Sequence, residues 1–478
     1  MNEVNVILDK RKNKRVRVHD KNHIKITFYA KDKLISGSVW DHSRFGLGVL
    51  LGPNELYLKK GLHISEIIIY SWNNRRTLGP GFITRTNKEI EGTFAGIILE
   101  NEFLDMDELA SFKKIHSQKD EIESIHVDLE SSKNISRSFR EFALNTAIVL
   151  STFKLSMDKI DLKIKSETAS IKNQIFNALA NGIGKDFSNQ LDNLLKELQS
   201  IGKNYNNDEI ITNGKFLRNL LWSYIELNPF IYRTTTKPRG YSEDSTMMKM
   251  IYENDFRGDS SFGKIFYYHS INTQAAIAVR NRVELISAEL ENHRKSISGK
   301  EYRILSIACG PADEISKFLN ANTRPISEII LFDQDELALA EAENTIELSG
   351  KRKKYNIRFV EDSMKRLLKV NNPTEIHGKF HFIYSMGLFD YMEEHIARLS
   401  LSALFNLLHE GGELIIGSFH KRNASKAYME YFMDWFLIYR NEKELQELAS
   451  SLTGNFKHSI EFDSTKSQMF LKIIKENH

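Results

Sequence analysis

The sequence contains very little cysteine and little proline. Its 478 residues include one cysteine, Cys309, and seven prolines. A single cysteine excludes an intrachain disulfide and a cysteine-rich zinc site, and it favours a reducing, cytoplasmic compartment. The scarcity of proline permits long helices.

The sequence also lacks a strong charge of either sign and any long apolar run. Lys and Arg number 66 and Asp and Glu 63, a formal net charge of +3. We therefore expect no general nucleic-acid surface, and any anion site must be local. No run of 18 apolar residues occurs, and Glu3 stands where a secretory signal carries basic residues, so we expect neither a transmembrane segment nor export.

Hydrophobic patterning divides this globular chain into three regions. Residues 1–105 contain short alternating runs separated by turn residues, which predict a small β-barrel or sandwich. Residues 106–230 follow helical spacing and predict a linker or interaction region that packs against a partner subunit or the third region. Residues 231–478 begin with a helical segment and alternate strands with helices from about 300, which predicts a mostly parallel, doubly wound α/β sheet.

The individual strands can be placed from the same pattern. In the first region we expect strands at 23–29, 34–39, 46–51, 63–72, 79–85 and 92–99. In the third region we expect strands at 303–308, 326–332, 357–360, 380–385 and 413–419, with helices at 312–319 and 336–348.

The ends of the later strands carry the candidate chemistry, because ligands of open α/β sheets bind beyond the carboxyl ends of the strands. The first strand ends in the small-residue turn 306–312, which lets a ligand approach the backbone around Gly310. Asp333 follows the second strand, 23 positions after Gly310 and near the spacing of roughly 20 at which an acid binds a nucleoside ribose. Asp362 and Ser363 end the third strand. A tight turn without a ligand is the alternative for the glycine turn alone.

These strand ends, taken in order, resemble the class I S-adenosylmethionine-dependent methyltransferase fold from about residue 294 to 478. The motifs Lys237-Pro238-Arg239-Gly240-Tyr241, Ala278-Val279-Arg280-Asn281-Arg282 and Asp434-Trp435-Phe436-Leu437-Ile438-Tyr439-Arg440 narrow the resemblance. The series looks like the bacterial methyltransferases of extracellular-factor, or 3-hydroxypalmitic acid methyl ester, biosynthesis. It covers about half of the chain, and Glu243 departs from it because that family usually has a glycine there.

The resemblance implies methyl transfer from S-adenosylmethionine to a carboxylate such as that of a 3-hydroxy fatty acid, which is ionised at neutral pH and needs no general base. It implies these cofactor-binding residues: Ala308, Gly310, Asp333, Gln334, Asp362, Ser363 and, near the methionine portion, Ser385. It places these residues on the acceptor side: Tyr241, Asp390, Tyr391, Tyr439 and Arg440. Arg440 could pair with the carboxylate. Core packing for Tyr391 and a structural ion pair for Arg440 are the alternatives.

Two short motifs surround the first strands. Arg11 and Arg15 form an RxxxR motif, and Asp41, Ser43 and Gly46 form a DxSxxG motif. Arginines grip phosphates and stack on guanine faces, a carboxylate can accept hydrogen bonds from a guanine edge, and a glycine lets the backbone turn beneath a ligand. Together the motifs resemble a PilZ domain, which implies cyclic di-GMP as a regulatory ligand. A solvated basic arm and an ordinary turn are the alternatives.

We therefore expect a multidomain, cyclic di-GMP-regulated methyltransferase without a metal site, which acts on a small molecule and forms a homo-oligomer through its helical region. The alternative is a cyclic di-GMP receptor or scaffold whose methyltransferase-like domain is catalytically silent. An enzyme would lose turnover when Asp333 is replaced, whereas a scaffold would keep its partner.

Overall fold

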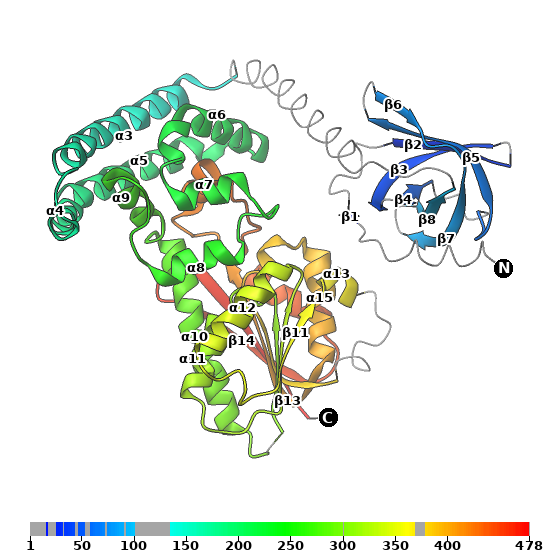
Figure 1. The fold of residues 1–478 in the computed structure, drawn as a ribbon. Helices are drawn as coiled ribbons and strands as arrows, with labels where there is room; N and C mark the ends of the chain where they lie inside the picture. The colour runs from blue at the N-terminus through cyan, green and yellow to red at the C-terminus, as the bar shows by residue number, and fades with distance from the viewer. Residues whose placement is uncertain are drawn as a thin grey trace. The chain divides into compact units, whose positions relative to one another are not determined.

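The structure is a computed structural model that describes residues 16–17, 25–31, 33–43, 46–52, 58–71, 74–89, 92–100, 134–299, 301–368 and 378–477 (Figure 1). The chain forms two compact units, residues 1–133 and 134–478. Arg11 and Arg15 lie outside the described residues, and of Ser43 only the backbone is described. Within the described ranges, no helix has both the length and the apolar composition needed to cross a bilayer.

The first unit is built around a closed barrel. Its strands are β1 (Val16–Arg17), β2 (Lys25–Ala30), β3 (Lys33–Ser43), β4 (Gly46–Leu51), β5 (His63–Ser71), β6 (Asn74–Thr77), β7 (Gly81–Glu89) and β8 (Gly92–Leu99). Antiparallel pairing runs β3-β2-β5-β7-β8-β4, and β3 also pairs with β4, so six strands close into a ring. Ile26, Phe28 and Ala30 alternate into the core with at most 1% exposure. The prediction of a small β-barrel is confirmed.

The second unit begins with packed helices. They are α3 (Arg137–Lys163), α4 (Ala169–Asn181), α5 (Ile183–Ile201), α6 (Asn207–Ile225), α7 (Pro229–Thr236), α8 (Ser245–Glu253), α9 (Ser261–Ser270) and α10 (Gln274–Ser296). The local sequence determines where several of these helices begin. The Ser136 side chain accepts a hydrogen bond from the Phe139 N–H at the start of α3, and Asn206 with Glu209 forms a capping box at the start of α6. Leucine and phenylalanine on the inner faces form the core.

The same unit continues as a seven-stranded sheet. Its strands and helices are β9 (Arg303–Ile307), α11 (Asp313–Ala321), β10 (Glu328–Asp333), α12 (Glu336–Leu348), β11 (Ile357–Glu361), α13 (Met364–Leu367), β12 (Phe380–Ser385), α15 (Glu394–Asn406), β13 (Leu408–Phe419), α16 (Glu442–Glu447), β14 (Phe456–Phe462) and β15 (Gln468–Lys475). The order is β11-β10-β9-β12-β13-β15-β14. β9 to β13 are parallel, and β15 runs antiparallel to β13 and β14.

Helices cover both faces of this sheet. α10, α11 and α12 pack on one face, and α13, α15 and α16 pack on the other (Figure 1). The predicted doubly wound sheet is thereby confirmed, and its parallel strands lie where the alternating pattern places them. The strand order reverses between β9 and β12, and crevices form beyond the carboxyl ends of the strands at such a point.

Candidate functional site

The turn after β9 has an unusual backbone. Ala308, Gly310 and Ala312 adopt positive φ angles of 53°, 53° and 56°. A non-glycine residue in this left-handed region costs about 1 to 2 kcal/mol, so Ala308 and Ala312 hold conformations that the surrounding structure must impose. A Cβ at Gly310 would meet no atom within 4 Å, so open space lies beside this part of the turn. A strained turn with open space beside it, at the point where the strand order of the sheet reverses, is suited to binding a ligand.

Asp333 ties this turn to the end of β10. One carboxylate oxygen accepts a hydrogen bond from the Gly310 N–H at 3.0 Å, and the other accepts one from the Asp335 N–H at 3.0 Å. The Asp333 carbonyl also accepts from the Asp362 N–H at 3.0 Å. Burial raises the pKa of Asp333, which is 8% exposed. Three predicted cofactor residues from three strand ends therefore meet at one place.

A cavity of about 320 Å³ opens at these strand ends. These predicted site residues line it: Tyr241, Ala308, Gly310, Asp333, Gln334, Asp362, Ser363 and Tyr391. The volume is within the range of small-molecule sites. The tertiary structure thus brings together residues that span 151 positions of the sequence.

Two predicted residues, Ser385 and Asp390, lie behind the cavity wall. Ser385 is fully buried at the end of β12, and its hydroxyl has no hydrogen-bond partner in the described part of the chain. Asp390 accepts hydrogen bonds from the Ser418 hydroxyl and the Phe419 N–H, both at 2.9 Å. Burial raises the pKa of Asp390 to about 7.

Tyr439 and Arg440 also lie away from the cavity. Tyr439 belongs to the helical core, where it is 9% exposed. The Arg440 guanidinium donates to the Phe389 carbonyl at 2.8 Å and to the Met392 carbonyl at 2.6 Å. In this arrangement Arg440 fixes the turn that carries Tyr391, and its donors are engaged with backbone.

Sequence reasoning did not place Glu243 and Arg282 in the site. Arg282 donates to Glu243 Oε1 at 2.8 Å, and Glu243 Oε2 accepts from the Tyr391 hydroxyl at 3.1 Å. The Trp435 indole N–H donates to the same Tyr391 hydroxyl at 2.7 Å. Both residues could have been singled out from the sequence. Arg282 ends the motif that begins at Ala278, and Glu243 stands where the similar family usually has a glycine.

Another buried carboxyl group, that of Glu314, forms part of the cavity wall. Glu314, in the first turn of α11, accepts a hydrogen bond from the Tyr384 hydroxyl at 2.7 Å. Burial raises the pKa of Glu314 to about 7. No periodic pattern or motif in the sequence indicates that this glutamate faces a cavity.

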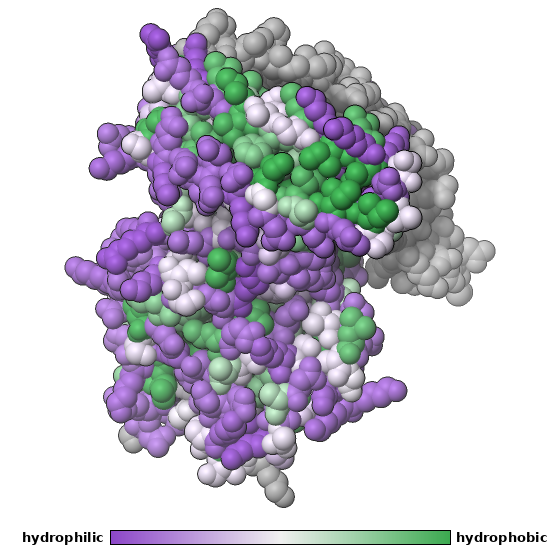
Figure 2. Space-filling model, turned by 90° about the vertical axis from the view of Figure 1, so that its left-hand side faces the viewer, coloured by the Kyte–Doolittle hydropathy of each residue, from purple (hydrophilic) through white to green (hydrophobic). Residues whose placement is uncertain are grey.

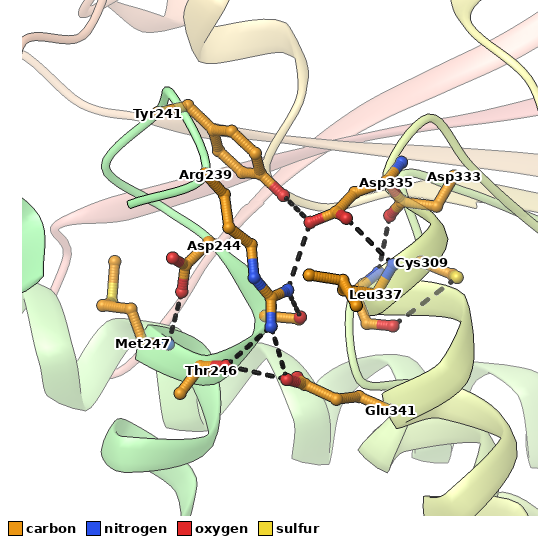
Figure 3. A network of polar contacts seen from close by, with 12 residues as sticks. Arg239, Tyr241, Asp244, Thr246, Met247, Cys309, Asp333, Asp335, Leu337 and Glu341 are labelled. Atoms are coloured by element: carbon orange, nitrogen blue, oxygen red, sulfur yellow. Dashed lines mark hydrogen bonds and ion pairs between the residues drawn. The ribbon is translucent and has the colours of Figure 1, made fainter. Parts of the chain in front are cut away.

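A short segment that ends at the first residue of α8, residues 237–245, is bonded to the loop after β10 and to α12 (Figure 3). Arg239 donates to Asp335 Oδ2 at 3.1 Å and to Glu341 Oε1 at 2.7 Å, and the Tyr241 hydroxyl donates to Asp335 Oδ2 at 2.7 Å. Burial opposes ionisation of Asp335, but the Tyr241 hydrogen bond and the Arg239 charge lower its pKa. We call residues 237–245 the clasp.

The described part of the second motif lies in the barrel. Asp41 is in β3, and Ser43 of β3 pairs with Gly46 of β4. A Cβ at Gly46 would lie 2.5 Å from the Ile97 carbonyl oxygen, so glycine is required for the close approach of β4 and β8. Nearby in the same sheet, the Arg85 guanidinium lies 5.2 Å from the centre of the Phe94 ring.

Comparison with known proteins gives structural likenesses only. No protein-family model and no curated protein sequence matches the chain. A protein described as a possible exported protein from Bordetella parapertussis shares 13% identity over 49% of this chain and 80% of its own, with a TM-score of 0.40. Magnesium protoporphyrin IX methyltransferase from Synechocystis with bound SAM shares 11% identity over 42% of this chain and 83% of its own, with a TM-score of 0.31. N-methyltransferase NodS from Bradyrhizobium japonicum shares 14% identity over 41% of this chain and 97% of its own, with a TM-score of 0.29.

Proposed function

We propose that the second unit is an S-adenosylmethionine-dependent methyltransferase and that the barrel is a PilZ-like receptor for cyclic di-GMP that regulates it. The observation that carries the enzyme proposal is the strained, open turn at Gly310 facing Asp333 where the strand order reverses. The sheet order, with antiparallel β15 between β13 and β14, is that of the class I methyltransferase fold and supports the same proposal.

The residues at the strand ends fit this cofactor. Gly310 offers open backbone, and the Asp333 carboxylate has lone pairs for a ribose diol beyond the two N–H groups that it already accepts. The nucleoside part of the site would be completed by Ala308, Gln334, Asp362 and Ser363. Ser385 would support the methionine part of the cofactor from behind the cavity wall. When bound, S-adenosylmethionine supplies an electrophilic methyl group on a sulfonium. The cavity carboxylates favour that positive charge.

For the acceptor we propose a carboxylate such as that of a 3-hydroxy fatty acid. Met248, Met386 and Leu388 line the cavity and suit an apolar chain, and Tyr241 and Tyr391 stand beside them. The protein's task is to hold the acceptor in line with the methyl group and to exclude water. Asp390, Tyr439 and Arg440 are proposed to position this wall from behind.

The test of the enzyme proposal is calorimetric titration of S-adenosylmethionine into the full chain and its Asp333→Ala variant. Loss of a buried charged acceptor should weaken binding by about 10- to 150-fold. Glu361→Ala is the control, because this exposed strand-end residue neighbours Asp362 without lining the cavity. Equal affinity of Asp333→Ala and wild type would refute the proposed cofactor site, and no binding by wild type would leave the scaffold alternative.

The regulatory proposal has its own test. Arg15→Ala should abolish binding of cyclic di-GMP while leaving the affinity for S-adenosylmethionine unchanged. In the wild type, saturating cyclic di-GMP should change the S-adenosylmethionine affinity or the turnover by about 5- to 150-fold, the usual range of allosteric coupling. Binding of the nucleotide with no effect on either quantity would separate a receptor function from enzyme regulation.

We also propose a cytoplasmic location, which the single, buried cysteine supports. The proposed partners are the small-molecule acceptor and a second copy of the chain that pairs through α3. The exposed apolar side chains of α3 support a second copy of the chain as a partner.

A further inference from the structure

The charges around the cavity are unbalanced. Four carboxyl groups are among its lining residues: Glu243, Glu314, Asp333 and Asp362. Arg282 is the one basic side chain among the described residues that line it. An acceptor that brings its own carboxylate into this cavity therefore has a single cation with which to pair.

That cation is already neutralised. The Arg282 and Glu243 side chains are 7% and 6% exposed, and their charged groups are 2.8 Å apart. Arg282 also interacts with the Tyr252 side chain, and it makes long contacts of 3.4 Å to the Met386 carbonyl and 3.5 Å to the Met248 sulfur. A Cβ at Gly387 would lie 2.7 Å from Glu243 Oε1, so the carboxylate is closely enclosed. An incoming carboxylate therefore competes with Glu243 for Arg282.

Glu243 lies on an element that differs from the one carrying Arg282. It lies in the clasp, outside regular secondary structure, whereas Arg282 lies in the middle of the long helix α10. The clasp is held by polar contacts from Arg239 and Tyr241 to Asp335 and Glu341 (Figure 3). The Glu243 side chain can withdraw without disturbing the sheet, because its hydrogen bonds are to the side chains of Arg282 and Tyr391.

We propose that Glu243 is a specificity-determining residue: it occupies the place on Arg282 that the acceptor's carboxylate takes, and acceptor binding exchanges one carboxylate for the other. This inference rests on the proposed carboxylate acceptor. Because one buried pair is lost for each pair gained, the charge contributes little net affinity. Affinity must then come from the apolar chain, at about fourfold per buried methylene, so short carboxylates are rejected.

Glu243→Gln tests the exchange, because it keeps the shape and removes the competing charge. Decanoate and the uncharged decanol are the probes, titrated calorimetrically into the full chain. Arg282 left without its counterion should bind decanoate at least about tenfold more tightly than wild type does, with less than a twofold change for decanol. Acetate should bind the variant detectably and the wild type not.

Glu314→Gln is the matched control. It removes another buried carboxyl from the same cavity but leaves the Arg282 pair intact, because Glu314 is bonded to Tyr384. Decanoate affinity should rise much less than in Glu243→Gln, because Glu314 acts on Arg282 only through its charge. Should Glu243→Gln fail to fold, Tyr391→Phe removes the hydroxyl that holds Glu243 Oε2 and should shift decanoate affinity in the same direction by about threefold.

Three results would overturn the inference: unchanged decanoate affinity in Glu243→Gln, an equal gain for decanol, or an equal gain in Glu314→Gln. These outcomes concern only how probes bind. Failure of the proposed methyltransferase function would instead appear as absent S-adenosylmethionine binding in the separate titration of the wild type, so the two failures are distinguishable.

Discussion

At the residue scale, buried carboxyl groups are a notable property of the second unit. Burial raises the pKa of Asp313 to about 6 and the pKa values of Glu314, Asp390, Glu413 and Glu430 to about 7. An unfolded Asp or Glu has a pKa near 4. The folded state therefore retains protons between about pH 4 and pH 7 that the unfolded state releases, and stability falls as the pH rises through this window.

Asp390→Asn should remove one part of this pH dependence. The amide oxygen can still accept from Ser418 and Phe419, and no charge forms in the buried site. We expect the melting temperature of the variant, relative to wild type, to be higher at pH 8 than at pH 5 by roughly 2 °C or more. Thermal unfolding at both pH values measures it. A constant difference between variant and wild type would show that Asp390 stays ionised when folded.

The sequence predicted part of the site at this scale. Asp333 and Gly310 could be found because each directly follows a predicted strand, and the carboxyl ends of parallel strands share one edge. Arg440 and Tyr439 could not be located, because their motif lies in a long connection whose path depends on packing against helices. Glu314 was missed since one turn of helix gives no indication of the cavity beneath it.

At the element scale, the clasp joins the segment before α8 to the loop after β10. Arg239 contributes two of its ion pairs, at 3.1 Å to Asp335 and 2.7 Å to Glu341. The clasp residue Tyr241 lines the cavity at the strand ends. If S-adenosylmethionine binds there as proposed, the contacts of the clasp should slow its release.

Arg239→Ala should raise the KM for S-adenosylmethionine by about tenfold and change kcat little, because the variant loosens a cavity wall without touching the reacting atoms. Stopped-flow dissociation should be faster by a similar factor. Lys237→Ala is the control, since Lys237 lies in the same segment but pairs with Asp434. An effect of Lys237→Ala as large as that of Arg239→Ala would show that general loosening is responsible.

The helix α3 carries several exposed apolar side chains. Figure 2 shows hydrophobic side chains gathered on one face of the upper, helical part of the molecule. In α3, Leu144, Ile148, Leu155 and Leu162 are 56 to 70% exposed, and the last three recur at intervals of seven residues, the spacing of a helix-pairing seam. The seven-residue spacing favours a second copy of the chain as the partner.

Leu155→Glu should therefore convert a dimer into a monomer in light scattering after size-exclusion chromatography, because it places a charge in the middle of this seam. Leu348→Glu is the control, since Leu348 is 80% exposed at the end of α12, away from α3. A wild type that is already monomeric at micromolar concentration would contradict α3 pairing.

At the scale of the whole molecule, the connection after β13 joins the core of the helical segment, whereas the two faces of the sheet have cores of their own. The connection after β13 contains a π-helix, η4 (Tyr428–Phe432), whose apolar side chains join the cluster formed by α3, α5 and α6. Arg218 of α6 donates to the Tyr431 carbonyl at 3.0 Å and to Asp434 at 2.8 Å. Removal of the helices would expose this connection, and with it Trp435, which contacts Tyr391 at the cavity.

A truncated chain of residues 134–478 should fold and bind S-adenosylmethionine with an affinity within about threefold of the full chain, because it retains one complete compact unit. Residues 231–478 should instead be poorly folded, with buried Phe432 and Met433 newly exposed. Circular dichroism and cofactor titration of both proteins test this. A stable, cofactor-binding 231–478 fragment would show that the helices are dispensable.

The sequence alone determined the order of the three regions along the chain. Strand alternation, helical spacing and strand-end residues depend on neighbours a few positions apart. These local patterns correctly predicted a barrel, helices and a doubly wound sheet. The boundaries expected at residues 105 and 230 stay predictions. The two RxxxR arginines also stay predictions, because Arg11 and Arg15 lie outside the described residues. Only the tertiary structure decided that Glu243 neutralises Arg282 and that the connection through Trp435 enters the helical core. Those contacts join residues 39 and more than 200 positions apart, and packing and the loss of water from charged groups select them.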